Sequence, residues 1–360
     1  MSARLEVTVR LVWNRSVRCV AVAFILVPSL FVSTPLGAQA VADSIGRWTT
    51  AIQTGTLLSK DSALAKLSAL PLQALPAETR AALVAELNRV HLGILAGGNI
   101  GMAGEDEDLV ADYYMELVVV VARFESQEAA LALAPAVSVS IGVARRVARY
   151  GDAAVAALLP LYARRYNEDT VMETLGLVWF WADSTGAPLS DRSRTQIVAV
   201  LTAALSSGVH RDLLGLQGAL AAIHDPAFLP LANKTDQVAA TFGILGRSTV
   251  VTMEDDVIPK LTALAASRSP SSLATGLARI VTAVCGNDAA GRRQGACQSI
   301  ANDVAAAMNH LAKGQTTPAR NGFESVGKKI DNAYAGGAFS DAEHALLAGN
   351  VAMLLQRLAP

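Results

Sequence analysis

Aromatic and charged side chains are scarce in this sequence. Of its 360 residues, 5% are aromatic and 17% are charged, whereas 52% are hydrophobic. Ala, Leu and Val dominate, a composition that favours closely packed helices over a β-sandwich. The 30 basic and 31 acidic residues give a formal net charge of -1, so no global field attracts nucleic acid. We expect an all-α protein with a large core and no nucleic-acid partner.

Catalytic and metal-binding signatures are also missing. The chain has three cysteines and five histidines, without CxxC, HExxH, GxSxG, Walker A or Rossmann patterns. Ser325–Lys328 matches the SxxK of serine penicillin-binding enzymes, but the accompanying motifs are absent. Asp341, Glu343 and His344 are the nearest approach to a metal cluster, although the start of a helix explains them. We predict no catalytic, cofactor or metal site.

The N-terminus predicts export. An apolar run, Cys19–Val32, is followed by the small-residue pattern Ala38–Ala40, as in a secretory signal cleaved after Ala40. The run is preceded by Arg4, Arg10, Arg15 and Arg18. The mature chain would begin at Val41, in the periplasm or outside the cell, without inserting into a membrane. An uncleaved N-terminal anchor is the alternative, because Cys19–Gly37 is nearly long enough to span a bilayer.

Two cysteines remain after such a cleavage. Cys285 and Cys297 bracket a polar segment, Gly286–Gly295, and in an oxidising compartment they most simply form a disulfide. Closing this loop would stabilise the fold by about 3 kcal/mol. A redox or metal role is the alternative, but the segment contains neither a CxxC nor a histidine.

Helix boundaries are clear in several places. Pro76 and Glu78 suit the first turn of a helix that ends near Leu95. The loop Gly97–Asp108 then ends in four acidic residues, which either complement a helix dipole or hold a cation. Ser126–Tyr150 should form a helix that kinks or restarts at its proline.

The C-terminal end predicts an αα-hairpin. Its first helix follows a linker at Gly314–Asn321, and its second begins at a capping box made by Ser340 and Glu343. Gly336–Gly337 would separate the two helices. This hairpin would cap a stack of helices.

Two arginine clusters close adjacent predicted helices and lie near the only dense aromatic cluster. The arginines form either an anionic-ligand patch or dipole-complementing ion pairs with Glu168 or Glu173. Two tryptophans at i and i+2 cannot share a helix face, so we expect one in the core and one near the surface. The candidate ligand or partner surface comprises Trp179, Trp181, Arg145, Arg146, Arg149, Arg164 and Arg165.

A helix-break-helix pattern occurs twice, at Asp152–Leu177 and in shortened form at Asp225–Ile244. Each copy carries Leu-Pro-Leu, centred on Pro160 or Pro230, followed by an Asp-x-Val pattern. Over Asp152–Ala266 this resembles HEAT-type helical repeats. The resemblance implies an irregular stack of antiparallel helix pairs, similar to an α-solenoid, with an extended binding surface.

These observations predict a signal peptide at 1–40, a helical-repeat-like domain at 41–270 and a C-terminal helical region at 271–360. We expect an exported, non-catalytic binding or scaffolding protein of the cell envelope, whose partner is another envelope protein. Two alternatives remain open: a binder of a small molecule or glycan, and a hydrolase with a dispersed acid pair.

Overall fold

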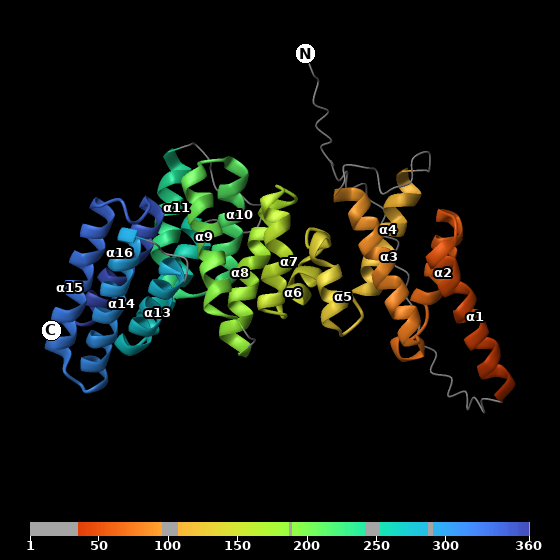
Figure 1. Ribbon diagram of the computed structural model, residues 1–360, viewed down its shortest axis with the longest axis horizontal. Helices are drawn as coiled ribbons and strands as arrows, with labels where there is room; N and C mark the ends of the chain where they lie inside the picture. The colour runs from red at the N-terminus through yellow and green to blue at the C-terminus, as the bar shows by residue number, and fades with distance from the viewer. Residues whose placement is uncertain (1–34, 96–106, 187–188, 242–252, 287–290, 360) are drawn as a thin grey trace, which may run out of the picture. The chain divides into compact units, whose positions relative to one another are not determined.

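The computed structural model describes residues 35–95, 107–186, 189–241, 253–286 and 291–359. Within these ranges it contains sixteen α-helices and no β-strand, so the predicted all-α class is confirmed (Figure 1). The helices are α1 Pro35–Thr54, α2 Leu57–Ser68, α3 Ala77–Leu95, α4 Glu107–Val121, α5 Gln127–Ala132, α6 Ile141–Ala148, α7 Asp152–Ala163, α8 Glu168–Thr185, α9 Asp191–Ser207, α10 His210–Ile223, α11 Leu229–Thr241, α12 Ile258–Ser267, α13 Pro270–Cys285, α14 Gly291–Ala312, α15 Thr316–Ala335 and α16 Asp341–Arg357. Short 3-10 helices and one π-helix, η4 Met253–Val257, connect some of them. The 3-10 helices include η2 Ala134–Ala136 and η3 Pro226–Phe228.

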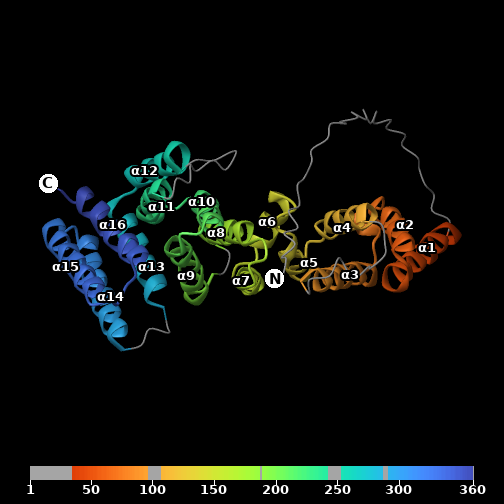
Figure 2. The same ribbon diagram turned by 90° about the horizontal axis from the view of Figure 1, so that it is seen from above.

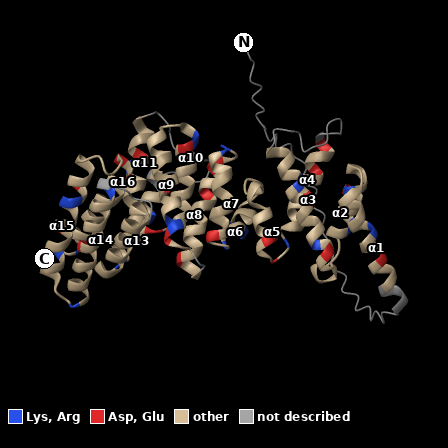
Figure 3. Ribbon diagram, in the orientation of Figure 1, with Lys and Arg blue, Asp and Glu red and all other residues tan. Residues whose placement is uncertain are grey.

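The chain divides into two compact units, Met1–Ser44 and Ile45–Pro360. The first contributes the beginning of α1. The second holds one continuous set of buried apolar side chains, the largest of which include Trp179, Tyr113, Phe228 and Phe323. Acidic and basic residues are interspersed along its helices (Figure 3).

Sequential helices of the second unit pack against one another. α8 contacts α6, α7 and α10, while α13 contacts α9, α14 and α16. Figure 2 shows α13, α14 and α16 next to one another at one end of this unit. The predicted C-terminal hairpin is confirmed as α15 and α16, with the capping box of Ser340 and Glu343 formed.

The first copy of the repeat has the predicted form. α7 and α8 pack together, and the chain reverses between them through left-handed backbone at Arg165 (φ 58) and Asn167 (φ 45). Few side chains other than Gly adopt such angles, so this reversal is a specific local feature. Because of this reversal, α7 ends at Ala163 and α8 begins at Glu168.

The second copy does not form a helix pair. α11 runs without a break from Leu229 to Thr241, so the prediction of two helices here is wrong. The copy lacks three residues between its Leu-Pro-Leu and Asp-x-Val elements, and with them the left-handed reversal. Pro230 instead occupies the first turn of α11, where its missing N–H leaves no hydrogen bond unmade.

The predicted helix Ser126–Tyr150 is interrupted at its proline, as expected: α5 ends before η2, which contains Pro135. The next helix, α6, begins after Ser140, which caps it by accepting a hydrogen bond from the Val143 N–H. Two other boundaries differ from expectation. α14 begins at Gly291, inside the segment predicted as a loop. α15 begins at Thr316, inside the predicted linker.

Cys285 and Cys297 lie at disulfide distance, with Cα atoms 5.6 Å apart. They join the end of α13 to α14, as predicted. No helix in the described ranges has the length and apolar character needed to cross a bilayer. The predicted cleavage point at Ala40 falls inside α1, whereas the apolar run before it and most of the acidic loop Gly97–Asp108 lie outside the described residues.

Candidate functional site

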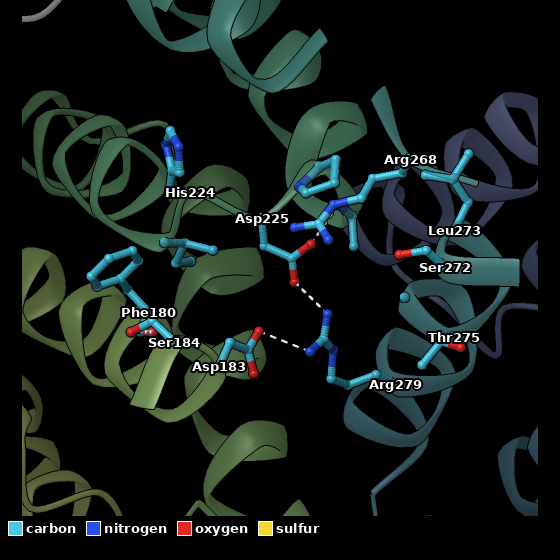
Figure 4. A pocket seen from close by; sticks show the side chains of 14 residues that line it. Phe180, Asp183, Ser184, His224, Asp225, Arg268, Ser272, Leu273, Thr275 and Arg279 are labelled. Atoms are coloured by element: carbon cyan, nitrogen blue, oxygen red, sulfur yellow. Dashed lines mark hydrogen bonds and ion pairs between the residues drawn. The ribbon is translucent and has the colours of Figure 1, made fainter. Parts of the chain in front are cut away.

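A cleft of about 390 Å³ opens between the C-terminal end of α8, the turn from α10 into η3, and α13 (Figure 4). Phe180 and Leu273 supply apolar wall, and Ser184 and Thr275 supply hydroxyl groups. Its volume falls in the range of small-molecule sites. The cleft is therefore large enough to enclose a metabolite-sized ligand.

Arg279 joins two carboxylates in this cleft. Its Nη1 lies 2.8 Å from Asp183 Oδ2, and its Nη2 lies 2.7 Å from Asp225 Oδ2. The planar guanidinium directs its donors in fixed directions. Arg279 therefore fixes the end of α8 and the start of η3 relative to α13.

The remaining oxygens of both carboxylates are also occupied. Asp183 Oδ1 accepts from Arg194 at 3.0 Å, and Asp225 Oδ1 accepts from the Ala227 N–H at 3.0 Å, which caps η3. Asp225 Oδ2 additionally accepts from the indole of Trp179 at 3.4 Å. Every oxygen of this pair therefore already accepts at least one hydrogen bond from the chain.

Trp179 forms the floor of the network and is fully buried. Its ring packs edge-on against Phe228, with centroids 5.0 Å apart. The guanidinium of Arg194 lies 4.6 Å from the ring centroid, and that of Arg279 lies 5.8 Å from it. Both cations are thus held over an aromatic face as well as by carboxylates.

The network leaves donors unused. Arg279 Nε and Arg194 Nη1 are buried and have no acceptor among the described residues. Arg268, at the mouth of the cleft, is exposed and makes no side-chain hydrogen bond or ion pair within the described chain. Figure 4 shows the side chains of Arg268 and Arg279 extending into the cleft. The cleft therefore offers positive hydrogen-bond donors.

The residues predicted as a ligand or partner surface do not converge on this cleft, apart from Trp179 beneath it. As expected, only one of the two tryptophans is fully buried; Trp181 is half-buried, 4.9 Å from the Arg149 guanidinium. Arg146 donates to the Phe124 carbonyl at 3.1 Å. The other three arginines, Arg145, Arg164 and Arg165, are exposed.

Arg165 takes part in the ion pairing predicted for its cluster. It contacts the buried carboxylate of Asp212, and its Nη1 lies 4.0 Å from Glu168 Oε1. Arg211 reaches the same Glu168 oxygen at 3.9 Å. Arg165 therefore lies over two buried carboxylates, those of Asp212 and Glu168.

Residues of the SxxK pattern and of the acidic cluster near His344 make contacts within the chain. Within the described ranges no three His, Cys, Asp or Glu side chains gather in a way that could hold a metal ion. Ser325 of the SxxK pattern donates to Asp303 at 3.3 Å, and that carboxylate also pairs with Lys329 at 2.7 Å. Glu343 accepts from Arg293 at 2.6 Å in addition to its capping role.

Sequence reasoning missed Asp183, Arg194, Arg268 and Arg279 as site residues. The one sequence signal near the site is Asp225. It stands directly before a proline at the start of the second repeat copy, a position typical of a helix cap, and it caps η3. Its ion-pair partner Arg279 is 54 residues away. No local pattern links the two.

Comparison of the chain with protein-family models, with curated proteins and with solved structures found no match.

Proposed function

We propose that this protein is an exported, non-catalytic helical binding protein of the cell envelope, and that its cleft holds a small ligand bearing a carboxylate or phosphate group. The observation that carries the proposal is Arg268, which has no ion-pair partner among the described residues and lies at a cleft whose other charges are matched. Export rests on the predicted signal at the N-terminus.

Charge matching inside the cleft gives the preference for an anion. Asp183 and Asp225 offset the charges of Arg194 and Arg279 through the contacts described above. Arg268 is then the uncompensated charge, and an anionic group that reaches it gains a charge-assisted hydrogen bond.

The apolar side of the cleft favours an apolar body for the part of the ligand that does not carry the charge. Phe180, Ile223 and Leu273 lie along the cleft, so an aliphatic or planar body would replace water there. Burying such a body contributes roughly 25 cal/mol per Å² of apolar surface. A compact acid with an apolar body fits this combination better than a fully hydroxylated sugar.

The occupied carboxylates favour binding over hydrolysis. Hydrolases that use an acid pair need one carboxyl group to donate a proton and the other to contact water or substrate. Asp183 and Asp225 accept bonds from the chain at all four oxygens. The pair therefore serves to position Arg279.

Isothermal titration calorimetry would test this function with a panel of small carboxylates, phosphate esters and neutral sugars. We expect an acid to bind, and Arg268→Ala to weaken its affinity by at least tenfold. Arg192→Ala, at an exposed arginine on α9 away from the cleft, is the control and should bind normally. Equal binding of sugars and acids, or full affinity in Arg268→Ala, would contradict the proposal.

A further inference from the structure

A second concave surface lies far along the sequence from the cleft, between α4 and α6. It has a volume of about 430 Å³ and is lined mainly by aliphatic side chains, among them Met115, Val119 and Val143. None of its lining residues lines the Arg279 cleft. The two surfaces can therefore be tested separately.

This groove exposes apolar side chains at its rim. Met115 is 44% exposed and Val119 is 58% exposed on α4, and Ile141, which adjoins the groove on α6, is 49% exposed. Single exposed hydrophobic residues are common on soluble proteins, whereas a contiguous apolar patch marks an interaction surface. Three such residues around one groove form a patch of this kind, here called the α4/α6 patch.

Opposite charges flank the α4/α6 patch. Asp112 precedes Met115 by three residues on α4, and Arg145 follows Ile141 by four on α6, so each shares the exposed helix face of its neighbour. Both side chains are exposed, and neither has a hydrogen-bond or ion-pair partner among the described residues. The patch thus offers an acid, an apolar centre and a base.

The other basic groups nearby are already used. Arg146 donates to the Phe124 carbonyl, and Arg123 donates to the carbonyls of Ser68 and Leu70, both at 2.7 Å. Arg145 is therefore the base that a partner would contact.

We propose that the α4/α6 patch docks a second copy of this chain in a two-fold arrangement. In such an interface residue i of one copy contacts residue j of the other, and j contacts i. A patch carrying both an acid and a base satisfies this requirement, because Asp112 of each copy pairs with Arg145 of the other while Met115, Val119 and Ile141 bury one another. A partner of a single charge would leave one of the two groups unpaired.

Sedimentation equilibrium on the purified full chain would test the dimer, since its affinity depends on few exposed apolar side chains and should be on the order of micromolar. Val119→Glu is expected to abolish the dimer. Leu58→Glu is the matched control, because Leu58 is 68% exposed but lies on α2 outside the patch. Circular dichroism would confirm that both variants keep the helix content of the parent.

Charge exchange tests the two-fold pairing. Asp112→Arg and Arg145→Asp should each weaken self-association severalfold, and the double variant should recover it. A mixture of the two single variants should form a heterodimer more readily than either forms a homodimer, since every facing pair is then opposite in charge. A chain that stays monomeric at all concentrations, a dimer insensitive to Val119→Glu, or a mixture with no heterodimer preference would each overturn the proposal.

Discussion

A Cβ atom on Gly176 would lie only 2.5 Å from the carbonyl oxygen of Ala219. α8 and α10 are therefore in backbone contact at this point, and Gly215 on the facing helix makes a similar approach to the Cα of Asp169, with a hypothetical Cβ at 2.8 Å. Glycine in mid-helix costs up to about 1 kcal/mol relative to alanine, and here that cost permits backbone contact between α8 and α10.

Gly176→Ala is expected to lower the free energy of unfolding by about 1–3 kcal/mol, because neither backbone can yield to the added methyl group. Urea unfolding followed by circular dichroism would measure the change. Gly46→Ala on α1, where nothing lies within 4 Å of the added atom, is the control and should leave stability unchanged or slightly raised. Equal stability of parent and Gly176→Ala would show that the two helices can separate without cost.

Asp225→Ala should destabilise the fold by about 2–4 kcal/mol, since it leaves the indole of Trp179 and the guanidinium of Arg279 without their shared acceptor. Asp183→Ala should cost less, because its side chain is more exposed than that of Asp225. A double-mutant cycle with Arg279→Ala would give the coupling between Asp225 and Arg279, expected at roughly 0.5–3 kcal/mol. Additive single-variant effects would show that the ion pair contributes nothing.

His91 makes stability depend on pH. Burial lowers the pKa of His91 from its ordinary value of 6.5 to about 4, and a backbone hydrogen bond involving Ala132 opposes this shift only in part. The unfolded chain therefore takes up a proton near pH 6.5 that the folded chain does not take up until about pH 4. The contribution of His91 to the free energy of unfolding is therefore fully present above pH 6.5, and it is lost as the pH falls from 6.5 to about 4.

Between pH 7 and pH 5 the loss from His91 should be about 2 kcal/mol, at 1.36 kcal/mol per unit of pKa shift. Urea unfolding at both pH values would measure it. His91→Gln retains a group that can contact the Tyr114 hydroxyl, now 3.0 Å from His91 Nε2, but cannot titrate. An unchanged pH dependence in this variant would assign the effect to other residues.

The bond between Cys285 and Cys297 should contribute about 3 kcal/mol to the free energy of unfolding by restricting the unfolded chain. The Cys285→Ser, Cys297→Ser double variant should therefore lose this amount, and a reductant should bring the parent to the same value. A parent protein whose unfolding midpoint does not change with reductant would indicate that the bond is not formed in solution.

Local chemistry made parts of the fold predictable. The capping box of Ser340 and Glu343 lies within three residues and forms as expected, and burial of Glu343, which raises its pKa, is outweighed by hydrogen bonds from Arg293 and Ser340 that set the pKa below its ordinary value. The helix predicted to start at Pro76 also forms, as α3 from Ala77. In each case the residues that decide the boundary are neighbours in sequence.

The repeat and the cleft show where sequence reasoning stops. Matching residues in the two repeat copies suggested matching structure, but the left-handed backbone at Arg165 and Asn167 has no counterpart near Pro230. Arg279 pairs with Asp183 across 96 residues, and this pairing follows from how α8 and α13 each pack against α9. Periodicity predicts which helix faces are buried, but not which polar side chains meet at the edge of the core.

The position of Asp225 also constrains how this protein can diverge. One carboxylate caps η3, receives the Trp179 indole and anchors Arg279, so a descendant that alters it must rebuild three contacts at once. Arg268 and His224 line the same cleft with exposed side chains that make no hydrogen bond or ion pair within the part of the chain that the structure describes. Natural variation in the proposed ligand preference should therefore accumulate at these rim positions, while the acidic anchor beneath them stays fixed through descent.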